Sequence, residues 1–238
     1  MKAIILFVCL ATIVACTPEP TTMYATSVMV DVTEEDGYRP TKEEVSKYAE
    51  LNDRSDGKRF SLVPITDLKS NTHFGVSIDP AYLGMNYDEM SRKSDLEKYV
   101  TRVDSLLIQL DSFQYGRDHS AVFPAVLDEA REIMSYKADE RRIIIYSDLD
   151  ENNAKFSLSN RAHKKLIGDP EALRLHFESV YGVTETDSFR GLVIEIHHVS
   201  TYQKETHFMV YMDLYKAVFE SRGATVKHQL LSIKTASS

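Results

Sequence analysis

Residues 141–153, "RRIIIYSDLDENN", constrain the fold more than any other stretch of this chain. The unbroken apolar run 143–145 predicts a strand buried on both faces, as in a parallel sheet covered by helices. Ser147, Asp148 and Asp150 follow where that strand stops. Asp and Asn favour strand-end turns, but open α/β sheets also bind ligands and metals at the carboxyl ends of their strands. Both interpretations stay open at this point.

Strand-like and helix-like runs alternate along the rest of the chain, with few exceptions. Such alternation predicts an α/β fold with three layers, a Rossmann-like doubly wound sheet that is mostly parallel and six-stranded. A short connection between two strands predicts a hairpin, and so one antiparallel edge strand. Right-handed crossovers then favour the strand order 3-2-1-4-5-6. We expect strands at 27–32, 59–65, 73–78, 142–147, 190–199 and 224–233. We expect a short helix at 41–52, further helices at 87–113, 120–137 and 206–223, and one or two short helices within 159–181.

This order makes the first and fourth strands neighbours at the point where the sheet reverses direction. Asp31 ends the first strand and Asp148 follows the fourth. Adjacent strands lie roughly 4.8 Å apart, so we expect the two carboxylates to face one small cleft. Their mutual repulsion would raise the pKa of at least one, unless a cation holds both charged.

The first residues predict export and anchoring to a membrane. Residues 1–15 read as a signal peptide, and Ile13-Val14-Ala15-Cys16 resembles the lipobox of bacterial lipoproteins. In that family the signal is cut before the Cys, which is then acylated, for example with palmitate. Residues 16–25 would be the lipidated Cys16 and a tether, and 26–238 one domain. The alternative is an ordinary signal peptide in which Cys16 is incidental.

Cysteine usage and charge exclude several classes of function. The chain has 2 Cys, of which Cys9 would leave with the signal and Cys16 would carry lipid. No disulfide framework, Cys-based zinc site or Cys nucleophile is then available. The formal net charge is −8 and no block of Lys and Arg occurs, which argues against a nucleic-acid partner.

Three separate segments carry a resemblance to a known family. Asp31-Val32-Thr33-Glu34-Glu35 follows the first strand, Ser120 precedes a helix, and Ser147-Asp148 ends the fourth strand. This layout resembles a von Willebrand factor A (vWA) domain. The metal-ion-dependent adhesion site of that family uses a D-x-S-x-S loop after the first strand, a Thr from a later loop and an Asp after the fourth strand. Residues 28–35, 62–71, 143–153 and 212–226 also resemble A-domain-like lipoproteins and exported proteins of anaerobic gut-type bacteria. Those proteins are mostly uncharacterised, so the resemblance implies a fold and not a specific function.

The resemblance implies a metal site built from four residues. Asp31 matches the first Asp, Thr33 the first Ser, and Ser120 the separate Thr, while Asp148 matches the late Asp that reaches the metal through water. The implied ion is Mg²⁺ or Mn²⁺. Glu35 stands where the second Ser belongs and departs from the pattern. A Glu can ligate Mg²⁺, but it adds negative charge to a site that the family keeps electrophilic.

Each of these residues also has a purely structural interpretation. Asp31 and Thr33 could satisfy the backbone of a loop, and Ser120 could cap a helix. Asp148 and Asp150, with Asn152, could only shape a turn. The convergence of three segments on one sheet edge favours a site, in which we assign Asp150 to the turn.

Other chemical motifs are weaker. Asp148-Leu149-Asp150 fits the D-x-D of Toprim domains, but the catalytic Glu that those domains place after strand 1 is absent. His197 and His198 are adjacent on a strand, so they should point to opposite faces and cannot share one ion. The sequence has no G-x-S-x-G, no Gly-rich phosphate loop and no H-E-x-x-H.

These features favour a non-enzymatic binding module, lipid-anchored in the bacterial cell envelope, that presents the Asp31 edge to an envelope protein. The alternative is a metal-dependent hydrolase or Toprim-like enzyme that uses Asp31, Asp148 and Asp150. No His or Lys is recognisable beside these carboxylates as a general acid or base, which argues against catalysis. A third interpretation is a scaffold whose site has been lost.

Overall fold

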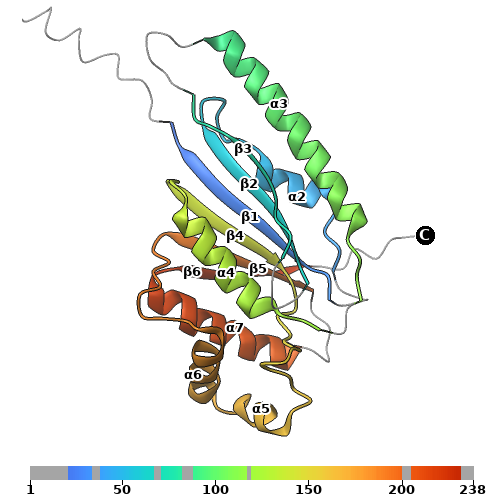
Figure 1. Ribbon diagram of the computed structural model, residues 1–238, viewed down its shortest axis with the longest axis vertical. Helices are drawn as coiled ribbons and strands as arrows, with labels where there is room; N and C mark the ends of the chain where they lie inside the picture. The colour runs from blue at the N-terminus through green and yellow to red at the C-terminus, as the bar shows by residue number, and fades with distance from the viewer. Residues whose placement is uncertain are drawn as a thin grey trace, which may run out of the picture.

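The computed structural model describes residues 21–33, 38–66, 71–81, 88–116, 119–199 and 205–231. One six-stranded sheet forms the middle layer, with helices on both faces (Figure 1). The strands are β1 (Met23–Asp31), β2 (Gly57–Ile65), β3 (Phe74–Ile78), β4 (Glu140–Tyr146), β5 (Leu192–Val199) and β6 (Thr225–Leu231). The helices are α2 (Lys42–Ala49), α3 (Glu89–Leu107), α4 (Val122–Ser135), α5 (Arg161–Leu166), α6 (Pro170–Tyr181) and α7 (Glu205–Phe219), and the 3₁₀ turns η2 (Ile108–Ser112) and η3 (Glu220–Arg222) extend α3 and α7.

The strand order confirms the predicted topology. The sheet runs β3-β2-β1-β4-β5-β6, with β3 antiparallel to β2 at one edge and all other pairs parallel. Val30 of β1 pairs with Tyr146 of β4. The residues that follow these two, Asp31 and Ser147, therefore emerge side by side at the carboxyl edge of the sheet.

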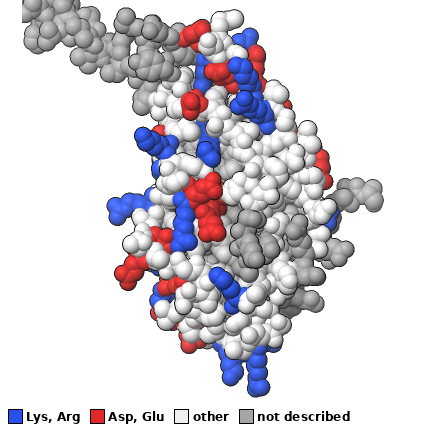
Figure 2. Space-filling model, in the orientation of Figure 1, with Lys and Arg blue, Asp and Glu red and all other residues white. Residues whose placement is uncertain are grey.

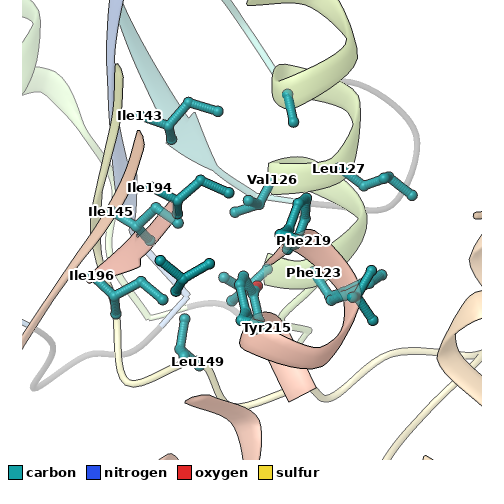
Figure 3. Packing of buried hydrophobic residues seen from close by; sticks show 14 of the residues in the cluster. Phe123, Val126, Leu127, Ile143, Ile145, Leu149, Ile194, Ile196, Tyr215 and Phe219 are labelled. Atoms are coloured by element: carbon teal, nitrogen blue, oxygen red, sulfur yellow. The ribbon is translucent and has the colours of Figure 1, made fainter. Parts of the chain in front are cut away.

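A buried hydrophobic cluster lies on each face of the sheet. On one face, β1, β4 and β5 pack against α4, α6 and α7, and Figure 3 shows Ile143, Ile145 and Ile194 of the strands opposite Phe123 and Phe219 of the helices. On the other face, Ile144 belongs to the cluster that β1, β2, α2 and α3 form. The Ile run of β4 is thus buried on both faces, as its sequence predicts.

Local signals explain where several helices begin and end. Thr41 and Glu44 form the predicted capping box of α2. The Asp169 side chain caps α6, whose first residue is Pro170, and Gly182 ends this helix in the left-handed conformation at φ 67°.

Some boundaries differ from the prediction. β1 begins at Met23, four residues before the predicted start, so residues 23–25 pair with β2 instead of belonging to the tether. These residues are anchored to the sheet. The sequence does not reveal the earlier start because Thr26, although buried, interrupts the apolar character of the strand. The predicted helix 87–113 ends as a regular helix at Leu107 and continues as η2.

Two predicted features lie outside the described residues: the signal segment with Cys16, and Glu35. In the part of the chain that the structure does describe, each helix is too short or too polar to cross a membrane.

Candidate functional site

Asp31, the last residue of β1, connects the two central strand ends. The Ser147 hydroxyl donates a hydrogen bond to Asp31 Oδ2 across 2.7 Å, from the residue directly after β4. The backbone N–H and hydroxyl of Thr33 both donate to Asp31 Oδ1, at 3.0 and 2.6 Å. All three residues are buried. The predicted meeting of the first and fourth strands is therefore confirmed, with Asp31 as its centre.

The loop after β4 turns sharply at Leu149. This residue has a φ of 63°, in the left-handed region that non-glycine residues rarely adopt. Its side chain is fully buried in the cluster that also holds Ile145 and Tyr215 (Figure 3). Burial holds the strained backbone in place, and hydrogen bonds support it: Leu149 N–H donates to Ser147 Oγ at 2.8 Å and Asp150 N–H to Asp148 Oδ1 at 3.0 Å. The Asp-Leu-Asp sequence is thus a turn, as one interpretation predicted, and it leaves Asp148 half-buried at the sheet edge.

Ser120 is joined to the same loop from a third segment. Its backbone exchanges two hydrogen bonds with Asn152, at 2.9 and 3.0 Å. Ser120 is buried, and its hydroxyl oxygen has no hydrogen-bond partner among the residues that the structure describes. The interpretation of Ser120 as a helix cap is wrong, because α4 has Ala121 at its N-cap position and no capping side chain there.

Glu151 is the residue of this region that the sequence does not reveal. It is 1% exposed and its carboxylate accepts hydrogen bonds from Phe123 N–H, at the start of α4, and from Asn153 Nδ2 at 2.6 Å. Glu151 therefore supplies the cap that α4 lacks in its own sequence, with its carboxyl group at the positive end of the helix dipole. Glu151 lies in the turn-forming stretch "DENN", where no hydrophobic periodicity marks a residue as buried. The only hint in the sequence is that the start of α4 has no capping side chain of its own, and so needs a partner from another segment.

Burial dominates the electrostatics of this edge. It raises the pKa of Asp31 above its usual value, against hydrogen bonds from Thr33 and Ser147, while repulsion from Asp148 contributes least. Burial also raises the pKa of Glu151 well above its usual value, and Asp31 and Asp150 add to that effect. The predicted repulsion between Asp31 and Asp148 exists, but loss of solvent is the larger cause.

The donor set suits a hard divalent cation. Asp31, Thr33, Ser120 and Asp148 offer only carboxylate and hydroxyl oxygens, the ligands that Mg²⁺ and Mn²⁺ take in proteins. The buried hydroxyl of Ser120 has no hydrogen-bond partner among the described residues, as expected of a hydroxyl that serves as a metal ligand. Burial makes the ionised form of Asp31 unfavourable, and a cation at this edge would stabilise that ionised form.

His197 and His198 point to opposite faces of the sheet, as predicted. The His197 ring lies 4.9 Å from the ring of Tyr146, and its Nε2 lies 3.5 Å from the hydroxyl of Tyr48 in α2. The His198 ring stacks on Phe208 of α7 at 3.9 Å. The two imidazoles belong to different layers and cannot ligate one ion.

The strand order and the single antiparallel edge strand are those that the sequence predicts, and they agree with the layout that the resemblance to vWA domains implies. Among solved structures, the chain is similar to the crystal structure of the SpRpn10 VWA domain, with 13% sequence identity and a TM-score of 0.40 over 89% of this chain and 90% of that one. No family model and no curated protein matches the sequence.

Proposed function

We propose that this protein is a non-enzymatic binding module, anchored by lipid at Cys16 in the bacterial cell envelope, that holds a protein partner through a divalent cation at the Asp31 edge. A vWA-like fold is compatible with a protein-interaction module, although fold alone does not assign a function. The proposal rests on the strand edge itself.

One observation carries the proposal: the buried Asp31 carboxylate at the junction of β1 and β4. Its two oxygens accept hydrogen bonds from Thr33 and Ser147, which fixes the orientation of the carboxylate before any ligand arrives. Functional sites need such support, because a side chain held by neighbouring hydrogen bonds loses little freedom on binding. A role in the fold alone would be met more cheaply by an uncharged residue, since burial penalises the ionised carboxylate.

Each of the four residues has a distinct role in this proposal. Asp31 supplies the negative charge, Thr33 and Ser120 supply neutral hydroxyl ligands, and Asp148 holds a water of the ion from its half-buried position. The ion, when bound, offers an open coordination position to a carboxylate of the partner. Glu35, two residues after Thr33 in the sequence, adds negative charge, so we expect tighter metal binding and weaker partner binding than a site with Ser at that position.

A divalent-ion titration followed by melting temperature tests the proposal. A ligand at 100 times its dissociation constant that binds only the native state adds about 2.7 kcal/mol, or a shift of roughly 5 °C or more for a domain of this size. We expect wild type to show this shift at millimolar Mg²⁺ or Mn²⁺, and Asp31→Ala to abolish it.

Asp150→Ala is the matched control, because Asp150 lies two residues from Asp148 but belongs to the turn. It should retain most of the Mg²⁺-dependent shift even if its own melting temperature falls. Absence of any shift in wild type at millimolar Mg²⁺ and Mn²⁺ would refute the metal site.

A further inference from the structure

A second cluster of potential metal ligands lies away from the Asp31 edge, between α4 and the start of β3. His73 directly precedes β3, and Glu129 and Glu132 are three residues apart on α4, so the two carboxylates share one face of the helix. One ligand atom of each residue lies within 4.8 Å of the others. Figure 2 shows acidic side chains gathered near the middle of the face that α4 occupies in Figure 1.

Glu129 is the observation that points to a ligand. This side chain is 3% exposed, and its Oε2 atom accepts no hydrogen bond from the described residues. The hydroxyl of Ser27, on the neighbouring β1, is also buried and lies close enough to Glu129 to lower the pKa of that carboxyl, although burial outweighs this effect. A buried carboxylate with an unsatisfied oxygen is costly, and native proteins normally provide a partner or an ion. Here the unsatisfied Oε2 is directed at His73 Nδ1, 3.4 Å away.

The spacing of the ligand atoms matches a small tetrahedral ion. Zn²⁺ bonds to imidazole nitrogen and carboxylate oxygen at about 2.0–2.1 Å, so two ligand atoms on one tetrahedral ion lie roughly 3.3 Å apart. The His73–Glu129 separation is 3.4 Å and the His73–Glu132 separation is 3.8 Å. Glu132, which is 43% exposed, would have to move closer to complete the set, from a position within 4.8 Å of the other two ligand atoms.

Tyr136 and Arg59 orient the Glu132 side chain, and a cavity lies beside the cluster. The Tyr136 hydroxyl donates to Glu132 Oε1, and Arg59 donates to that hydroxyl at 2.9 Å, so the other carboxylate oxygen faces His73. His73 and Glu132 also line a cavity of about 510 Å³ between β2, β3, α3 and α4. Solvent can therefore reach the position that three protein ligands would leave vacant on a tetrahedral ion.

We propose that His73, Glu129 and Glu132 form a Zn²⁺ site with a fourth position open to this cavity. Two carboxylates balance the charge of a divalent ion, and the imidazole favours zinc over Mg²⁺, which prefers an all-oxygen shell. Three protein ligands with an accessible fourth position are the pattern of reactive zinc sites, whereas structural zinc sites are closed by four. This site shares no residue with the Asp31 edge and does not depend on the function proposed there.

Zinc titration of the full chain by calorimetry, with matched variants, tests the site. We expect wild type to bind one Zn²⁺ at this cluster, and His73→Gln and Glu129→Gln each to weaken that binding at least about 10-fold, because loss of even an outer-shell partner costs about that much. Asp128→Asn is the control, since Asp128 lies next to Glu129 on α4 but its side chain is 76% exposed and outside the cluster. Asp31→Ala should leave the zinc affinity unchanged, which separates the two sites.

Substitution by Co²⁺ gives a second readout that does not depend on affinity. The wild-type complex should show the visible absorption of tetrahedral Co²⁺, and His73→Gln should lose it while melting like wild type without metal, since His73 is 38% exposed. Absence of zinc binding in wild type, or unchanged binding in both His73→Gln and Glu129→Gln, would overturn the proposal.

Discussion

At the scale of single residues, the loop after β4 shows what tertiary structure adds to a sequence pattern. The abrupt polar end of the strand correctly predicts that Asp31 and Asp148 meet at one edge. It does not reveal that Leu149 adopts a left-handed backbone and enters the core, because nothing local distinguishes it from a turn residue. Nor does it reveal Glu151, since the partner of this carboxylate, Phe123 N–H, lies 28 residues away in the sequence. A local sequence pattern cannot reveal hydrogen bonds between residues that are far apart in the sequence.

Glu151 should make the stability of the protein depend on pH. Its pKa in the folded state is raised well above 4.5, so the folded protein binds the proton more tightly than the unfolded chain. The free energy of unfolding should therefore fall as pH rises from about 4.5 toward that higher pKa. In metal-free buffer, we expect Glu151→Gln to lose stability less steeply than wild type as pH rises above about 4.5, in denaturant unfolding at each pH. Equal slopes for the two proteins would contradict the assignment.

At the scale of elements, α4 organises one face of the molecule. It carries Glu129 and Glu132, and its start is capped by Glu151 from the loop after β4. Its middle is tied to the segment before β5, because Arg131 donates two parallel hydrogen bonds to Asp187, at 2.9 and 2.8 Å. The sequence predicts this helix over 120–137, but a local pattern carries no information about distant partners. The ionic and capping contacts of α4 come from distant segments and could not be predicted.

The Arg131–Asp187 pair gives a prediction of opposite pH dependence. Arg131 lowers the pKa of Asp187 from 3.8 to about 2, so the stabilisation is present above about pH 4 and is lost as pH falls through 2. Because Arg131 is 35% exposed and partly screened by solvent, we expect Asp187→Asn to cost about 1–2 kcal/mol at pH 7. The deficit should disappear near pH 2. Asp128→Asn, 3.8 Å from the same Arg131 but exposed, should cost under about 0.5 kcal/mol at either pH.

At the scale of the whole molecule, alternation of strands and helices was enough to predict the sheet. A few topological rules predict the six strands, their order and the antiparallel edge strand. The main rule is that crossover connections between parallel strands are right-handed. The start of β1 was less predictable, since a buried strand end with Thr and Ser resembles a tether. The four predicted site residues lie in three segments that this sheet brings to one edge.

The proposed attachment to a membrane is also tested on the whole molecule. If Cys16 is acylated, several acyl chains should hold the protein on a membrane surface, whereas one chain alone binds only marginally. We expect Cys16→Ser to move the protein from the membrane fraction to the soluble fraction on centrifugation of lysed cells. Cys9→Ser, within the predicted signal, should leave the distribution unchanged. Membrane association of Cys16→Ser equal to that of wild type would refute the anchor.

The most direct test of the central claim is the anomalous difference map of a crystal of this protein grown with Mn²⁺, which stands in for Mg²⁺ and scatters anomalously. Our account predicts a peak at the carboxyl edge of β1 and β4, bounded by oxygens of Asp31, Thr33 and Ser120, with Asp148 reaching it through water. A map from protein saturated with Mn²⁺ that has no peak at this edge would contradict the account.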